Sequence, residues 1–88
     1  MKGIDYIFWV RTPTKEAEWA DRARRFLKAE MKRAGVTYAD MAERLKKHGL
    51  EETEASITSK LGRGTFAATF FLASIAALEL EGVRLEDL

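Results

Sequence analysis

Apolar side chains recur every three or four residues between positions 19 and 34, a spacing that places them on one face of an α-helix. This face comprises Trp19, Ala23, Phe26, Leu27, Met31 and Ala34. Thr14 can cap the helix, Glu16 and Glu18 suit the positive end of its dipole, and Gly35 can end it. We therefore expect a long first helix between Thr14 and Gly35.

A second, shorter helix follows directly in the stretch "VTYADMAERLKKHG". Thr37 is the expected N-cap, and Val36 and Met41 are spaced for a hydrophobic staple around it. Gly49 is the expected stop, and Leu50 can fold back over that end.

Thr53 is the expected cap of a third helix, Glu54 to Leu61, which "GRG" then breaks. Ile57 and Leu61, one turn apart, are its expected buried residues. The polar residues expected to remain outside are Ser56, Thr58, Ser59 and Lys60.

A fourth helix is predicted from a cap at Thr65 to Gly82, and it is apolar nearly all round. Such a helix lies at the centre of a small core or has a second face buried at an interface. In the closing turn after it, Val83, Leu85 and Leu88 can cover the core.

The N-terminal segment "IDYIFWVRT" is dense in aromatic and branched side chains, which favours an extended strand, and Pro13 separates it from the helices. The predicted fold is all-α, with four to five helices and a short N-terminal β-strand. Residues 1–13 are the extended segment, and residues 14–88 are the helical domain.

The composition of the chain limits the classes of function that the protein can have. Eighty-eight residues allow one domain, and the absence of cysteine excludes disulfides and thiol catalysis. The run "YIFWV" is far too short to span a bilayer, so we expect no membrane association and a cytoplasmic location. His48 lies among lysines without a plausible nucleophile nearby, so we expect no enzyme, cofactor, metal or small-molecule substrate.

Charge is distributed unevenly along the chain. Residues 1–48 carry twelve Lys and Arg against seven Asp and Glu, whereas residues 49–88 carry three against seven. The asymmetry is a reason to look for a basic face. Solvated helix faces that differ by chance would give the same numbers.

The third predicted helix is short and carries small hydroxyl side chains on its outside. Short side chains allow a backbone to approach a nucleic-acid groove closely, and Ser and Thr can bond phosphates or base edges. The alternative reading is that these are ordinary soluble surface residues.

The order of elements from Phe26 to Leu88 resembles the Cro/repressor type of helix-turn-helix domain, also called XRE-like or lambda-repressor-like. "FLKAEMKRAGVT" is similar to the opening helix of that family, "ADMAERL" to its second helix and "ASITSKLGRG" to its recognition helix. "FLASIAALELEGVRLEDL" is similar to its closing segment, and the chain also looks like a small group of poorly characterised bacterial domains on this plan.

The resemblance implies that the third helix enters the major groove of double-stranded DNA. The residues then expected at base edges or in the groove are Ser56, Thr58, Ser59 and Lys60. The residues expected at phosphates are Thr37, Tyr38, Lys46, Lys47 and Arg63.

The chain departs from the family pattern in two places. Fourteen residues separate Ala42 from Ile57, more than the tight family turn spans, so either the second helix is longer or the turn is a real loop. The third helix also lacks outward Gln, Asn and Arg, the side chains that commonly read bases.

A solitary strand would leave its backbone groups unpaired, and pairing with the same strand of a second copy would satisfy them in a two-fold homodimer. The residues expected at this contact are Ile4, Tyr6, Ile7, Phe8, Trp9 and Val10. The alternatives are a strand that lies across its own helices and a loose tail.

The function expected from the sequence is therefore a bacterial DNA-binding transcriptional regulator that acts as a homodimer. The second hypothesis is a protein-interaction module that keeps the same scaffold without binding DNA. RNA binding is a weaker third option, because no exposed aromatic platform is evident.

Overall fold

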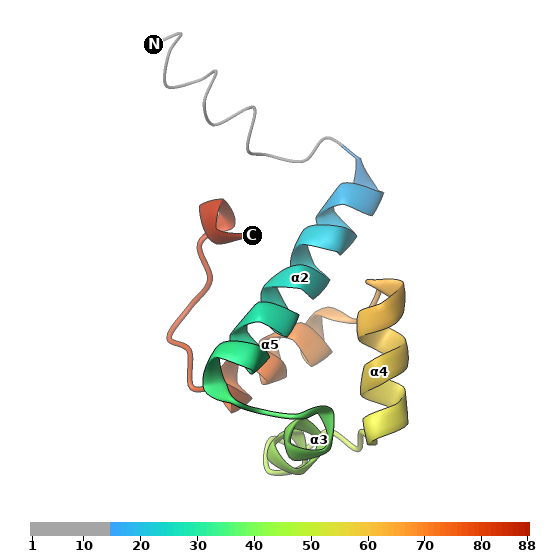
Figure 1. Cartoon of the computed structure of the whole chain (residues 1–88), viewed down its shortest axis with the longest axis vertical. Helices are drawn as coiled ribbons and strands as arrows, with labels where there is room; N and C mark the ends of the chain where they lie inside the picture. Colours follow the sequence, from blue (N-terminus) through green and yellow to red (C-terminus); the bar gives the residue numbers. More distant parts are fainter. Residues whose placement is uncertain (1–14) are drawn as a thin grey trace, which may run out of the picture.

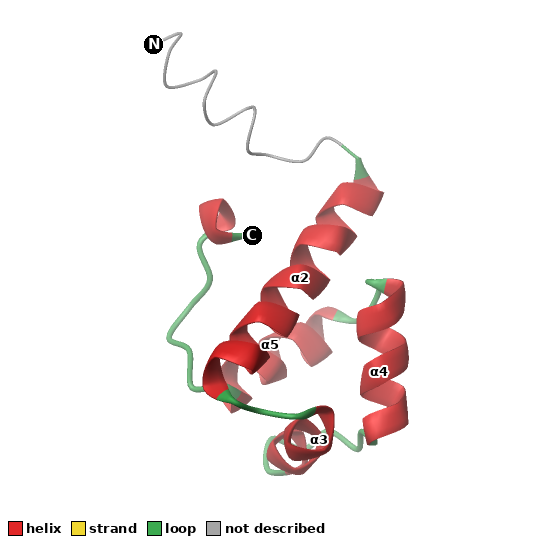
Figure 2. Ribbon diagram, in the orientation of Figure 1, coloured by secondary structure: helices red, strands yellow, loops and turns green. Residues whose placement is uncertain are grey.

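The computed structural model describes residues 15–88, and these residues fold into helices joined by loops, with no strand among them (Figures 1 and 2). The elements are α2 (Glu16–Ala34), α3 (Tyr38–Lys46), α4 (Glu54–Arg63), α5 (Ala68–Ala77) and a 3-10 helix, η1 (Leu85–Asp87). The all-α prediction is confirmed for this part of the chain. The predicted strand, its dimer contact, the cap at Thr14 and the boundary at residue 13 lie outside the described residues.

Helix α3 joins two other helices in the packing of the domain. This helix packs against both α4 and α5, and α4 also contacts α2. In Figure 1, α3 is seen nearly end-on below α2, and the chain after α5 runs back along the opposite side of α2 from α4. The guanidinium of Arg22 fastens this returning segment by donating a hydrogen bond to the carbonyl oxygen of Leu88 at 2.7 Å.

Helix α2 ends at Gly35, as predicted. Gly35 takes a left-handed conformation with φ of 70°. Its N–H donates to the carbonyl of Lys32 at 3.1 Å, and the N–H of Val36 donates to Met31 at 2.9 Å. These two bonds satisfy carbonyls that the end of a helix leaves without partners. At the other end the N-cap position is Lys15, one residue later than the sequence suggested.

Helix α3 begins with a capping box. The N–H of Asp40 donates to the hydroxyl of Thr37 at 3.0 Å, and the N–H of Thr37 donates to the Asp40 carboxylate at 3.1 Å. The hydrogen bond from the backbone N–H of Thr37, and then the interaction with the Thr37 side chain, hold the pKa of the Asp40 carboxyl below its ordinary value. Val36 and Met41 are both buried, as expected for a staple around this cap.

Helix α3 stops at Lys46, three residues before the predicted stop at Gly49. Gly49 still makes the left-handed turn, with φ of 87°, and the N–H of Leu50 donates back to Leu45 at 3.1 Å. The long spacing between the second and third helices is therefore a real loop, residues 47–53, and not a longer helix.

Helix α4 also begins with a capping box, in which the N–H of Ser56 donates to the hydroxyl of Thr53 at 3.0 Å. The predicted cap is confirmed, but the helix continues through Gly62 and ends at Gly64, with φ of 79°. A glycine inside a helix costs about 1 kcal/mol and does not by itself end it. The left-handed Gly64 does end it.

Helix α5 is shorter than predicted at both ends. Its N-cap is Ala67, so Thr65 does not cap it, and its last residue is Ala77. Glu79, a non-glycine residue, takes the left-handed conformation with φ of 61°. The N–H groups of Glu79 and Leu80 donate to the carbonyls of Ala76 and Ile75 at 2.9 and 3.1 Å, which closes the helix before Gly82.

The core collects one face of every α-helix. Its buried apolar residues are Leu27, Met31, Val36, Met41, Leu45, Ile57, Leu61, Phe70, Ile75, Ala77 and Leu78. Phe71 and Val83 pack partly against it, whereas Leu72 and Leu85 are mostly exposed. The prediction that Leu85 covers the core is therefore wrong. None of the helices in residues 15–88 is both long and apolar enough to cross a bilayer.

Candidate functional site

Helix α4 is anchored by two side chains that solvent does not reach. Ile57 and Leu61 are 0% and 1% exposed, and they lie one turn apart on the side that faces the core. Successive residues of an α-helix are about 100° apart, so the opposite side is formed by a different set of positions. These exposed residues, which we call the outer face of α4, are Ala55, Thr58, Ser59, Gly62 and Arg63.

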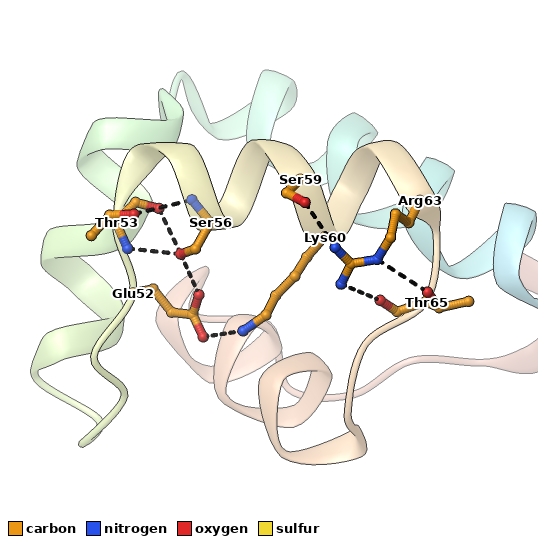
Figure 3. Close-up of polar contacts among 7 residues, drawn as sticks. All are labelled: Glu52, Thr53, Ser56, Ser59, Lys60, Arg63 and Thr65. Carbon is orange, nitrogen blue, oxygen red and sulfur yellow. Dashed lines mark hydrogen bonds and ion pairs between the residues drawn. The ribbon is translucent and has the colours of Figure 1, made fainter.

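The polar groups of the outer face are organised along the helix. The hydroxyl of Thr58 donates to the carbonyl of Glu54 at 2.8 Å. The guanidinium of Arg63 donates to the hydroxyl of Ser59 at 2.7 Å and reaches Thr65 through two longer contacts of 3.4 Å (Figure 3). Arg63 therefore lies over the last turn of α4, where a cation is stabilised by the helix dipole.

Ser56 and Lys60 do not belong to the outer face. Both are half-buried and both turn toward Glu52, in the loop before the helix (Figure 3). The hydroxyl of Ser56 donates to one carboxylate oxygen of Glu52 at 2.6 Å, and the ammonium of Lys60 pairs with the other. Lys60 also lies 5.0 Å from the centre of the Phe70 ring. The expectation that Ser56 and Lys60 stand outside the fold is thus wrong.

The reason is geometric. Ser56 and Lys60 each precede a buried residue by one position and lie on one flank of the buried side of α4, whereas Thr58 and Gly62 each follow a buried residue and lie on the other flank. On the flank of Ser56 and Lys60, Glu52 of the loop 47–53 contacts both residues and the ring of Phe70 in α5 lies beside Lys60, and the sequence of α4 alone does not reveal these neighbours.

Glu52 is a residue of the candidate site that sequence reasoning missed. Its side chain is only 8% exposed. Burial by itself raises the pKa of Glu52, but the hydrogen bonds from Lys60 and Ser56 and the charge of Lys60 outweigh it, so the pKa lies below the ordinary 4.5. The positive charge of Lys60 is consequently neutralised inside the molecule.

The residues predicted at phosphates are spread over the two ends of α3 and the end of α4. Thr37 and Tyr38 begin α3 and Lys46 and Lys47 end it, about 13 Å away at the helical rise per residue. Tyr38 is half-buried against the core, while Thr37 is exposed but forms the cap. The structure therefore does not bring these residues into one cluster.

The two lysines at the end of α3 differ in surroundings. Lys46 is exposed and lies 3.9 Å from Glu43, a distance typical of a weak surface ion pair. Lys47 lines a shallow groove with Arg44, His48 and the end of α5. Arg44 itself crosses this groove and donates to the carbonyl of Ala77 at 2.9 Å.

Three of the six basic side chains of α2 form ion pairs within the helix. Arg24 and Arg25 both contact Asp21, at 2.6 and 3.0 Å, and Arg33 pairs with Glu30. Arg22 is used to hold the C-terminal segment. These ion pairs and the bond to Leu88 reduce the number of unpaired positive charges on the surface of α2.

Residues 15–88 thus define a small all-α domain in which α4 is fixed from one side and exposes short side chains on the other. Residues 19–83 match the model of a family described as a domain of unknown function, DUF6471, and the chain belongs to this family. Neither the curated proteins nor the solved structures contain a match to the chain.

Proposed function

We propose that this protein binds double-stranded DNA through the outer face of α4 and acts as a transcriptional regulator on a helix-turn-helix plan of the Cro/repressor type. The observation that carries the proposal is the contrast between the two sides of α4. Ile57 and Leu61 fix the helix to the core, and no side chain on the outer face is bulky except Arg63. A helix of this kind can approach the floor of a major groove closely.

The outer face supplies modest but suitable chemistry for this role. Thr58 and Ser59 carry hydroxyls that can bond base edges, and Ala55 and the methyl group of Thr58 can contact the methyl group of thymine. Arg63, at the end of the helix, can bond a phosphate. Ser56 and Lys60 are not proposed to contact the DNA groove, because both already bind Glu52.

Phosphate contacts are proposed for Lys46, Lys47 and Arg63, with Thr37 and Tyr38 at the start of α3 as further partners. Three cations per copy make the salt dependence informative. Log affinity should fall against log salt with a slope of about −3 for one bound copy and about −5 for two. The predicted homodimer depends on residues outside the described part and remains a prediction, and a cytoplasmic location is part of the same proposal.

The test is fluorescence anisotropy of labelled duplexes from a mixed-sequence library, measured at several salt concentrations. The variant Lys46→Glu/Lys47→Glu/Arg63→Glu should lose binding by at least tenfold. Its matched control, Lys15→Glu/Lys28→Glu/Lys32→Glu, changes net charge equally at exposed positions of α2 and its cap. Equal losses in both variants, or affinity that does not respond to salt, would contradict DNA binding through this site.

A second candidate is a protein-interaction module on the same scaffold. It is favoured by the acidic residues at the start of α4, where Glu51 and Glu54 are exposed and would repel phosphates, and by the internal neutralisation of Lys60. Substitution of Ser59 by Glu on the outer face of α4 distinguishes DNA binding from protein interaction. Loss of duplex binding supports the first function, whereas a protein that never binds duplexes but retains a protein partner supports the second.

A further inference from the structure

An apolar groove lies between α5 and the segment that returns after it. The residues that line it are Phe71, Leu72, Ile75, Ala76, Leu80, Glu81, Gly82, Val83, Leu85 and Leu88. Among the described residues, Leu72 and Leu85 are the large hydrophobic side chains that stand exposed, at 65% and 58%. The groove is open to solvent, with a volume of about 440 Å³, within the range of about 300–1,000 Å³ typical of ligand pockets.

Both walls of the groove are held in place. The left-handed turn at Glu79 redirects the chain, with Leu80 bonded back to Ile75 at 3.1 Å. At the far end Arg22 holds the carbonyl of Leu88 at 2.7 Å. The groove is therefore a formed concave surface and not a loose contact, and each Å² of apolar area buried in it contributes about 25 cal/mol.

The chain contains a segment suited to fill it. Residues 4–10 hold six apolar side chains, including the uninterrupted run "YIFWV", and they lie outside the described residues. The segment contains the acidic Asp5 and is flanked by the basic residues Lys2 and Arg11, so residues 2–11 carry a net charge of +1, and the groove carries the acidic Glu81 in its lining. Apolar content and charge are thus complementary.

The segment is also within reach. Arg22, which holds Leu88, lies six residues into α2 from Glu16, about 9 Å along the helix. Val10 precedes Lys15 by five residues and Ile4 by eleven, which gives extended reaches of up to about 17 and 36 Å. Both values exceed the distance along α2 to the Leu88 end of the groove.

We infer that residues 4–10 dock into the groove between α5 and residues 80–88 of their own chain. A short linker gives a tethered segment an effective concentration on the order of millimolar, which a second copy would have to match in solution. Docking within one chain therefore outcompetes exchange between copies at ordinary concentrations. The inference goes beyond the proposed function. It also replaces the prediction that this segment pairs with the same strand of a second copy.

Because the chain has no cysteine, engineered pairs report the docking directly. Asp5→Cys is combined in turn with Glu81→Cys and Leu85→Cys in the full chain, and with Glu54→Cys on α4 as the control. Under mild oxidation we expect an intrachain disulfide with at least one groove position and much less with Glu54→Cys. A disulfide between chains, no disulfide with either groove position, or equal yield in the control overturns the inference.

A second measurement needs no engineered cysteine. In a Trp19→Phe background Trp9 is the remaining tryptophan, and its quenching by acrylamide should be several-fold weaker than in urea at all protein concentrations. Leu72→Lys should expose Trp9, whereas Thr69→Lys, at an exposed position of α5 outside the groove, should not. Protection that requires concentrated protein, or that survives Leu72→Lys, refutes docking in the same chain. No DNA is involved, so the result is separate from that for the proposed function.

Discussion

The ammonium group of Lys60 pairs with the carboxylate of Glu52 across the turn into α4, and the ring of Phe70 lies 5.0 Å from that ammonium. Glu52 is also the acceptor for the hydroxyl of Ser56, which itself belongs to the cap of the helix. One buried carboxylate therefore connects the loop 47–53 to both ends of the buried flank of α4. This connection fixes the orientation in which α4 presents its outer face.

The first prediction concerns pH. The folded pKa of Glu52 is depressed, so its contribution to stability is present above the ordinary value of 4.5 and is lost as the pH falls through the lower, folded value. Glu52→Gln should reduce the free energy of unfolding by about 1–2 kcal/mol at pH 7. The difference from the parent protein should shrink below pH 4.5. Urea titrations across this range check it, with exposed Glu51→Gln as the control that should change little.

The second prediction concerns the end of α4. A Cβ at Gly64 would lie 2.9 Å from Cδ of Arg24 and 3.3 Å from the carbonyl of Ala20, at a φ of 79°. Gly35 has a similar φ of 70° but nothing within 4 Å of such a Cβ. Gly35→Ala should therefore cost about 1–2 kcal/mol from backbone strain alone, and Gly64→Ala about 1 kcal/mol more. Equal costs in thermal or urea unfolding would mean that α4 does not pack against α2 this closely.

The third prediction is a stabilising substitution. Glu79 is a non-glycine residue in the left-handed conformation, which costs an L-residue about 1–2 kcal/mol. Glu79→Gly removes this strain and loses part of the gain to the greater freedom of glycine when unfolded, so a net stabilisation of about 0.5–1 kcal/mol is expected. Glu81→Gly, two residues later and also exposed, should not stabilise. A decrease in stability for Glu79→Gly would show that its side chain has a role that outweighs the strain.

The fourth prediction concerns Ser74, which is 0% exposed on α5. Its hydroxyl has no hydrogen-bond partner within the described part of the chain. An unsatisfied buried polar group costs about 1–3 kcal/mol, so Ser74→Ala should leave stability unchanged or raise it by up to about 1 kcal/mol. Exposed Ser59→Ala should change it by less than about 0.5 kcal/mol. A clear loss in Ser74→Ala, measured by urea unfolding, would reveal that the hydroxyl is bonded in solution.

Local signals in the sequence were sufficient for most of the helical framework. Thr37 and Thr53 cap their helices through bonds to residues three positions later, and both caps can be anticipated because donor and acceptor lie within one turn. Gly35 ends α2 for an equally local reason, since its backbone can take the left-handed conformation without strain. Ile57 and Leu61 are buried because their spacing matches one turn of helix.

Local signals misplaced both ends of α5, although the contacts made at these ends lie within a few residues of each other along the chain. Thr65 has a hydroxyl side chain suited to an N-cap, but its hydroxyl accepts a contact from Arg63 instead. Helix α5 begins three residues later, at Ala68. Glu79 ends α5 although Gly82 is intrinsically better suited, because the bonds of Glu79 and Leu80 to the end of the helix offset the strain.

The sequence by itself determined the helices, their caps and the residues that anchor α4, because each depends on bonds or periodicity within a few positions. The tertiary structure alone decided which polar side chains of α4 remain available. Ser56 and Lys60 turn to Glu52, while Thr58, Ser59 and Arg63 stay at the surface. The physical reason is that the exposure of a half-buried flank depends on what packs beside it, and here that is Glu52 in the loop before α4 and Phe70 in α5, which the periodicity of α4 does not specify.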